Sequence, residues 1–310
     1  MKRPVRMLEL DSGQPSEPLD RFGARRVRSA GGRSDMRLLL LLPVGMLAGT
    51  SIAGPPVYVG REVPVAARRP LSEIDHRTWD ALLRQFVDGR GLVDYAAWRA
   101  SSQAMQDLDD YLQALSSARI SSDDDRAATL AFWINAYNAL TIKGILREYP
   151  TSSIRNHTSR FLGYNIWKDL RLWVDGKPRS LDQIEHDILR KSREPRIHFA
   201  IVCASLGCPR LRNEAYIPAR LEDQLADNAR DFFADTRRFQ VDAQQKIVRV
   251  SPILDWFGED FGRDLTERMR TIAPFLAEDG RRAALDPHVT VEFLDYDWAL
   301  NDRSTHSNAP

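Results

Sequence analysis

The sequence lacks several features that would identify a protein class directly. It contains only two cysteines, Cys203 and Cys208, and no internal repeat. Its most apolar run, residues 38–48, has about a dozen residues, whereas a helix needs about 20 to span a bilayer. The formal net charge is only +1. These absences argue against a repeat architecture and a stable membrane anchor, and they give no electrostatic reason to expect nucleic acid as a partner.

The short apolar run fits the core of a signal peptide. Arg37 precedes it, and residues 51–53 (Ser-Ile-Ala) supply the small side chains that a signal peptidase recognises. We therefore expect a signal peptide over residues 36–53, cleavage near Ala53, and a periplasmic or secreted mature protein. Residues 1–35 are rich in Arg, Gly, Ser and Pro without apolar periodicity, which indicates an over-long gene start or a leader.

The remainder of the chain predicts one globular domain over residues 71–301. Residues 54–70 resemble an N-terminal tail, residues 302–310 resemble a polar C-terminal tail, and no linker divides the segment between them. About 230 residues are enough to bury one large core. Without the first 53 residues the charge changes to a small acidic excess, so the mature chain has no basic surplus either.

Apolar spacing and turn signals predict alternating helices and strands. An Asp-Gly turn at residues 175–176 predicts a hairpin, and Ser180 with Gln183 forms a capping box. The interleaving has no strict βαβ rhythm, so we predict an α+β fold with helices packed on a mixed, mostly antiparallel sheet. Helices are predicted over 79–86, 102–115, 123–149 (capped by Ser122), 180–190, 219–235, 252–256 (ended by Gly258) and 264–276, and strands over 93–95, 171–174, 177–179, 197–204, 239–241, 247–250 and 289–293.

Polar side chains interrupt the apolar face of the helix predicted over residues 123–149. Asn135, Tyr137 and Asn138 lie on or beside that face, and a buried amide without a partner costs about 1–3 kcal/mol. Two interpretations stay open. The amides hold neighbouring loop backbone, or they line a pocket and bind a substrate carbonyl or orient a catalytic imidazole.

Glu185 and His186 form an adjacent acid–histidine pair on the next predicted helix. Neighbouring helical positions point about 100° apart, so the two side chains cannot face the same point. The pair lies at the boundary of the apolar stripe of Leu181, Ile184 and Ile188. It is therefore either a solvated edge or part of a pocket wall.

The apolar run over residues 197–204 predicts a buried strand that delivers Cys203 to a small-residue turn containing Ser205. In a strand, His198 and Cys203 would point to opposite faces and lie about 17 Å apart, so they could not form a local dyad. A base for a nucleophilic Cys203 would then come from elsewhere, and His186 is the best placed by sequence.

The cysteine pair has three possible roles. Four intervening residues allow a structural disulfide between Cys203 and Cys208. Alternatively, Cys203 is a thiolate nucleophile with His186 as its base. The third alternative is a zinc site drawn from Glu185, His186, His198, Cys203 and Cys208, although this spacing matches no strong metal motif, and we predict no metal and no cofactor.

Taken together, these segments resemble the family known as domain of unknown function 547. The resemblance covers nearly the whole domain in order, although Gly207 stands where the family typically has serine. It rests on residues 131–139 (AFWINAYNA), 180–186 (SLDQIEH), 195–200 (PRIHFA), 203–211 (CASLGCPRL), 251–257 (SPILDWF) and 296–301 (YDWALN). The resemblance implies a single domain with a polar cluster, and it implies no reaction.

The order of helix and strands is also similar to that of papain-like and transglutaminase-like folds. In those folds the nucleophilic cysteine opens the helix, whereas this helix carries Asn135, so the likeness is a fold-level analogy only.

Two functions remain open from the sequence. The leading hypothesis is a thiol-dependent hydrolase or acyl transferase for amide or peptide-like substrates, in which Cys203 attacks, His186 is the base and Glu185 or Asn138 orients it. The substrate-binding residues would be Asn135, Asn138, Tyr137, His198 and Ser205. The alternative is a non-catalytic binding or structural module with a Cys203–Cys208 disulfide. In either case the expected partner is a small molecule or a peptide.

Overall fold

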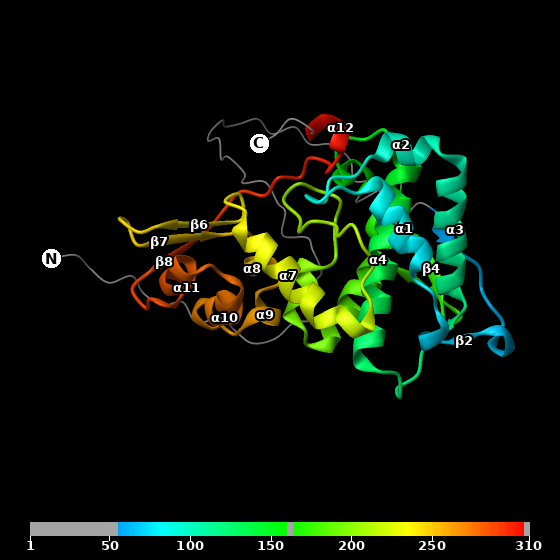
Figure 1. Cartoon of the computed structure of the whole chain (residues 1–310), viewed down its shortest axis with the longest axis horizontal. Helices are drawn as coiled ribbons and strands as arrows, with labels where there is room; N and C mark the ends of the chain where they lie inside the picture. The colour runs from blue at the N-terminus through cyan, green and yellow to red at the C-terminus, as the bar shows by residue number, and fades with distance from the viewer. Residues whose placement is uncertain (1–54, 160–163, 307–310) are drawn as a thin grey trace, which may run out of the picture. The chain divides into compact units, whose positions relative to one another are not determined.

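The computed structural model describes residues 55–159 and 164–306 (Figure 1). The leader and signal peptide expected in residues 1–53, and the last four residues of the polar tail, lie outside the described residues. Within the described ranges, no helix combines the length and apolar character that crossing a membrane requires.

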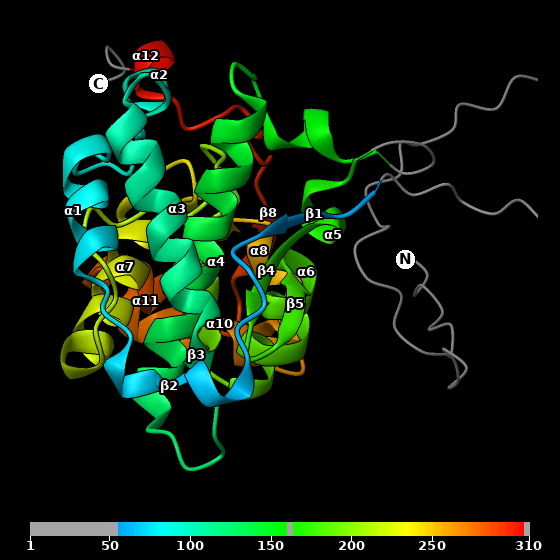
Figure 2. The ribbon, with the colours of Figure 1, turned by 90° about the vertical axis from the view of Figure 1, so that its right-hand side faces the viewer.

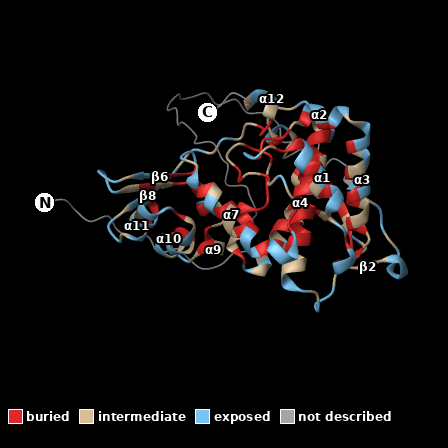
Figure 3. Cartoon of the chain, in the orientation of Figure 1, coloured by how far each residue is buried: buried red, intermediate tan, exposed pale blue. Residues whose placement is uncertain are grey.

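Four helices build the first part of the fold. They are α1 (Arg77–Phe86), α2 (Tyr95–Ala100), α3 (Ser102–Ser116) and α4 (Arg126–Glu148). Helix α4 is buried along most of its length (Figure 3). The predicted helix over residues 123–149 is confirmed, but its cap is Asp125, whose side chain accepts a hydrogen bond from the Ala128 N–H, and not Ser122.

Short strands flank these helices. Strand β4 (Leu170–Val174) pairs parallel with β1 (Val57–Val59) and antiparallel with β5 (Lys177–Ser180); Figure 2 shows β1 beside β4. Asp175 and Gly176 both have positive φ, as a type I′ turn requires, so the predicted hairpin is confirmed. A second parallel pair joins β2 (Arg69–Pro70) and β3 (Ala118–Arg119). Residues 57–70, where we expected a tail, thus contribute two strands.

The third sheet lies in the C-terminal part of the chain. Strands β6 (Phe239–Asp242) and β7 (Ile247–Val250) form the second predicted hairpin, and β8 (Thr290–Phe293) adds parallel to β7 (Figure 1). The α+β class is confirmed. The sheets are small and mixed, however, and parallel pairs outnumber antiparallel ones among the described strands, so the expectation of a mostly antiparallel sheet was wrong.

The helices that pack near the third sheet are short. Helix α7 (Leu221–Ala234) has the predicted position, and α10 (Leu265–Ile272) and α11 (Glu278–Leu285) follow later. The segment after Ser251 gives α8 (Ile253–Trp256) and then α9 (Gly258–Phe261). Gly258 therefore begins a helix, although the sequence predicted that it ends one.

Buried apolar side chains form two clusters. The first core includes α1–α4 and the β1–β4–β5 sheet, and the second core includes α7, α10 and the third sheet. Residues 195–202 lie between them, because Ile197 and Ala200 belong to the first core while Phe199 belongs to the second.

The predicted strand over residues 197–204 was wrong. Pro195–Phe199 is a 3-10 helix with Pro195 in its first turn, and Glu194 caps it by accepting a hydrogen bond from the Arg196 N–H. The following residues form no strand. The apolar run is buried as expected, but turn hydrogen bonds and side-chain amides satisfy its backbone.

Two elements complete the surroundings of the site. Helix α5 (Ile166–Asp169) precedes β4, and the predicted capping box of Ser180 and Gln183 starts α6 (Leu181–Gln183). This helix continues as one π-helical segment over Ile184–Leu189 and a 3-10 turn over Arg190–Ser192. The short helix α12 (Arg303–His306) lies in the predicted polar tail.

Candidate functional site

The two cysteine sulfurs lie in contact. Both cysteines are free, and their Sγ atoms are 2.7 Å apart. The Cys203 backbone N–H donates a hydrogen bond to Cys208 Sγ at 2.8 Å. Cys203 Sγ also lies 3.0 Å from Ser205 Oγ and 3.1 Å from the Tyr296 hydroxyl. These groups form one polar cluster, the cysteine cluster, defined as Cys203, Ser205, Cys208 and Tyr296.

The loop that carries the cysteines is held from two sides. The Asn138 amide on α4 donates to the Ala200 carbonyl and accepts from the Val202 N–H, both at 3.0 Å. On the other side, residues 297–301 exchange backbone hydrogen bonds with residues 204–207. Ala204 has φ of 57°, which costs a non-glycine residue about 1–2 kcal/mol. Backbone strain of this kind persists where the surrounding structure fixes it, as these contacts do.

The two thiols of the cysteine cluster have different pKa values. Burial opposes ionisation of Cys208, but the Cys203 thiol, the Tyr296 hydroxyl, the Cys203 N–H and the charge of Arg238 lower its pKa to about 7. Burial and the neighbouring Cys208 raise the pKa of Cys203 well above its usual value. A thiolate is therefore available at Cys208 near neutral pH, next to a protonated Cys203.

A cavity of about 90 Å³ lies beside Cys208. Its wall includes Cys208, Ser205, Asn301 and His306 together with four arginines and no carboxylate; the arginines are Arg90, Arg210, Arg237 and Arg238. A wall of this charge stabilises a thiolate.

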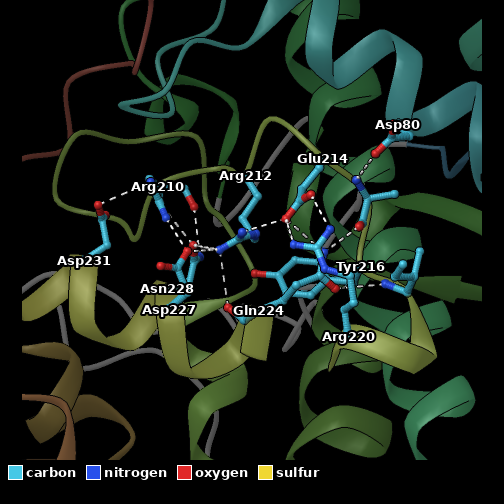
Figure 4. Close-up of polar contacts among 12 residues, drawn as sticks. Asp80, Arg210, Arg212, Glu214, Tyr216, Arg220, Gln224, Asp227, Asn228 and Asp231 are labelled. Atoms are coloured by element: carbon cyan, nitrogen blue, oxygen red, sulfur yellow. Dashed lines mark hydrogen bonds and ion pairs between the residues drawn. The ribbon is translucent and has the colours of Figure 1, made fainter. Parts of the chain in front are cut away.

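Salt bridges fix the segment that follows the cysteines, residues 210–214, to helix α7. Figure 4 shows Arg210 between Asp227, Asn228 and Asp231, and Arg212 between Asp227 and Glu214.

The Asn135 amide holds the end of the same segment. Its Nδ2 donates to the Tyr216 carbonyl at 2.8 Å and its Oδ1 accepts from the Tyr216 N–H at 2.9 Å. Both asparagines therefore hold loop backbone, which is the first of the two interpretations from the sequence.

The histidines belong to a second cluster, defined as His186, Arg190, His198 and Asp260. Asp260 Oδ2 lies 2.7 Å from His198 Nε2 and 2.6 Å from Arg190 Nε, while Arg190 Nη1 lies 3.0 Å from His186 Nδ1. The Phe257 ring stacks on His198 with centroids 4.2 Å apart. This histidine cluster connects the π-helical segment after α6 with α9.

The pKa values of His198 and Asp260 in the histidine cluster are also shifted. Burial lowers the pKa of His198 despite the adjacent carboxylate, so the ring is neutral at pH 7 and its Nε2–H donates to Asp260. Partial burial opposes ionisation of Asp260, but hydrogen bonds from His198 and Arg190 lower its pKa to about 2. The Asp260 carboxylate is thus the charged acceptor that holds the cluster together.

Glu185 lies apart from its neighbour His186. The Tyr137 hydroxyl donates to Glu185 Oε2 at 2.9 Å, and burial raises the pKa of Glu185. Burial and then the charges of Glu185 and both cysteines raise the pKa of Tyr137. Tyr137 thus contacts Glu185 and lies near enough to the cysteines for their charges to raise its pKa.

The structure thus divides the residues singled out by sequence. Cys203, Ser205 and Cys208 lie together, Asn138 supports them, and Glu185 approaches through Tyr137. His186 and His198 belong to the histidine cluster, and the polar side chains beside His186 are those of Arg190 and Asp182, not that of Cys203. Cys203 as nucleophile and His186 as its base stay a prediction.

Sequence reasoning missed the partners that complete each cluster. Tyr296, Arg238 and Asp260 lie far along the chain from the cysteines and histidines that they contact. The Arg237-Arg238 pair and the Tyr296-Asp297-Trp298 segment were the available signals. In the described ranges, no group of three or more His, Cys, Asp or Glu side chains is placed to hold a metal ion, so the zinc alternative has no support.

Comparison with known proteins relates part of the chain to a family. Residues 121–233 match the family model described as "Protein of unknown function, DUF547". The chain therefore contains a segment that is similar to the DUF547 family. The matched segment includes α4, the cysteine loop and α7, whereas the Tyr296 region lies beyond it. No curated protein and no solved structure matches the chain, so neither a reaction nor the analogy with papain-like or transglutaminase-like folds gains support.

Proposed function

We propose that this protein acts through the Cys203–Cys208 pair as a dithiol–disulfide centre. The observation that carries the proposal is the 2.7 Å contact between the two sulfurs, one of which ionises near neutral pH. A dithiol needs no separate base, because a thiolate is already present at Cys208. The contacts that stabilise it belong to the cysteine cluster itself.

The proposed reaction is thiol–disulfide exchange. The Cys208 thiolate attacks one sulfur of a substrate disulfide and releases the other sulfur as a thiolate. Cys203 then loses its proton and attacks the Cys208 sulfur of the mixed disulfide, which releases the second substrate thiolate. The substrate disulfide gains two electrons and the cysteine pair loses two. Consumption of the Cys208 charge removes one of the effects that raise the pKa of Cys203.

Mass analysis after reaction with a small aromatic disulfide tests this proposal. The wild type should release two aromatic thiolates per chain and end as an internal disulfide without adduct. Cys203→Ser should stop as a stable mixed disulfide at Cys208, and the rate should rise with pH around 7. Two independent adducts on the wild type would contradict the proposal. A pair already oxidised in the isolated protein and resistant to reductant would instead support the structural disulfide.

Acyl transfer is the second candidate function, and the position of Tyr137 favours it. This hydroxyl contacts the Glu185 carboxyl, whose pKa is raised, and lies near enough to the cysteines for their charges to raise its own pKa. In this candidate Cys203 attacks an amide or peptide-like carbonyl and forms a thioester, the carbon–nitrogen bond breaks, and the amine leaves with the proton that Cys203 has lost. A thioester adduct from an activated acyl substrate, lost in Glu185→Gln, would support it, and absence of any acyl adduct would remove it.

Export is a separate proposal that rests on the sequence alone. The apolar run behind Arg37 and the small residues 51–53 predict that the mature protein begins near Gly54. N-terminal sequencing of the protein recovered outside the cytoplasm tests this. A secreted product that retains Met36 would contradict cleavage.

A further inference from the structure

The wall of the cavity beside Cys208 includes arginines and no carboxylate. Arg238 and Arg210 contribute to this wall, and the carboxylates that pair with them, Asp235, Asp227 and Asp231, do not. Arg90 and Arg237 of the wall are likewise paired with carboxylates that lie outside it, Asp88 and Asp235. A ligand in the cavity is therefore bordered by arginines and by no carboxylate.

Arg238 has the least satisfied side chain of this wall. Its side chain is 9% exposed, and in the described part of the chain its Nε has no hydrogen-bond partner. Its other nitrogens reach the Leu206 carbonyl at 3.2 Å and Asp235 at 3.4 Å. Burial lowers the pKa of this guanidinium, which shows how little solvent screens its charge. This Nε is covered by protein atoms, so a ligand in the cavity would meet the guanidinium through its charge and its terminal nitrogens, and a poorly screened guanidinium favours an anionic neighbour.

The size and charge of the cavity select the anion. A volume of about 90 Å³ exceeds the roughly 10–15 Å³ that admits a single water and suits a small group of a few heavy atoms. Because each arginine of the wall already pairs with a carboxylate, the cavity suits a ligand with one negative charge better than a ligand with two.

We propose that this cavity binds the carboxylate of a small substrate through Arg238, with Arg210 supplying charge, and so places the substrate against Cys208. Arg210 acts in this arrangement mainly through its charge, because Asp227 and Asn228 (Figure 4) and the Gly89 carbonyl accept hydrogen bonds from three of its five N–H groups. The proposal that the cavity binds a carboxylate follows from the cavity alone. The proposal that this carboxylate belongs to a substrate rests on the proposed function.

Alkylation of Cys208 by two matched reagents tests the proposal. Iodoacetate and iodoacetamide are similar in size and differ in charge, and each transfers a two-carbon group to the thiolate with release of iodide. Relative to a small free thiol in the same buffer, the wild type should favour iodoacetate by about tenfold. Arg238→Gln should remove that preference, and Arg249→Gln, which lies outside the cavity wall, should preserve it.

Two measurements keep the test decisive if Arg238→Gln does not fold. Added salt should reduce the preference of the wild type for iodoacetate, and acetate should protect Cys208 from it. Equal preference in the wild type, or no alkylation of Cys208 at all, would overturn the proposal. Protection by phosphate at lower concentration than acetate would overturn the carboxylate assignment. Alkylation requires no disulfide exchange, so a failure here is distinguishable from a failure of the dithiol function.

Discussion

The cysteine cluster and the histidine cluster each combine residues between 186 and 208 with one residue from far along the chain, yet they differ in how their polar groups are used. In the histidine cluster, Asp260 accepts from both His198 and Arg190, and an aromatic ring covers His198. In the cysteine cluster, Cys208 lies at a cavity wall that includes arginines and no carboxylate. Ion pairs and hydrogen bonds hold the elements of the histidine cluster together, whereas the cavity beside Cys208 offers polar and charged residues to a ligand.

The largest expected effect comes from removing the Asn138 hydrogen bonds that hold the cysteine loop. Asn138→Leu leaves the buried Ala200 carbonyl and Val202 N–H without partners, so the free energy of unfolding should fall by about 3 kcal/mol. Urea unfolding measures this, with the exposed Gln106→Leu on α3 as the matched control. A variant as stable as the parent would show that the Asn138 amide does not stabilise the cysteine loop.

The next prediction tests the histidine cluster by removing the Asp260 carboxylate, which accepts hydrogen bonds from His198 and Arg190. Asp260→Asn should lower the free energy of unfolding by about 2 kcal/mol, the value of a carboxyl pKa lowered from 3.8 to about 2. Because the pKa is lower in the folded state, this contribution is present above about pH 4 and is lost as the pH falls towards 2. The neighbouring Glu259→Gln is the control.

That measurement has a second readout at the other cluster. Since Asp260 does not contact either cysteine, Asp260→Asn should leave the pH midpoint of Cys208 alkylation near 7. A midpoint that moves by a full pH unit would show that the two clusters act as one site.

The smallest expected effect concerns the strained residue in the cysteine loop. Ala204→Gly relieves a left-handed conformation worth about 1–2 kcal/mol. It also loses a buried methyl group worth about 0.8 kcal/mol, and the greater freedom of glycine in the unfolded chain costs about 0.4–1 kcal/mol more. The net change in unfolding free energy should lie near zero. Ala139→Gly within α4 loses the methyl group without relief and should destabilise by about 2 kcal/mol. Equal losses at the two positions would contradict the strain at Ala204.

Local signals predicted much of this fold. The apolar spacing of α4 placed Asn135 and Asn138 on buried positions, the Asp175-Gly176 pair fixed a hairpin, and the Ser180–Gln183 capping box began a helix. Each of these depends on residues a few positions apart, so a single sequence contains the information.

The failures share a physical cause. The apolar run at residues 197–204 specifies burial but not backbone conformation, and both a strand and a 3-10 helix followed by a loop satisfy it. The parallel pairs of β1 with β4 and of β7 with β8 join distant segments that no local pattern connects. The site itself combines the cysteines with Tyr296 and Arg238, and only the tertiary fold makes them neighbours.

The backbone ladder between residues 204–207 and 297–301 has a consequence for biosynthesis. The ribosome completes both cysteines long before it adds the segment that pairs with their loop. In a nascent chain, neither the distance between the two sulfurs nor their pKa values are therefore fixed. The folded geometry of the cysteine loop forms only after residue 301 has left the ribosome. Reactivity at Cys208 would then report that synthesis has passed this point, and a chain truncated before Asp297 would contain the thiols without the chemistry.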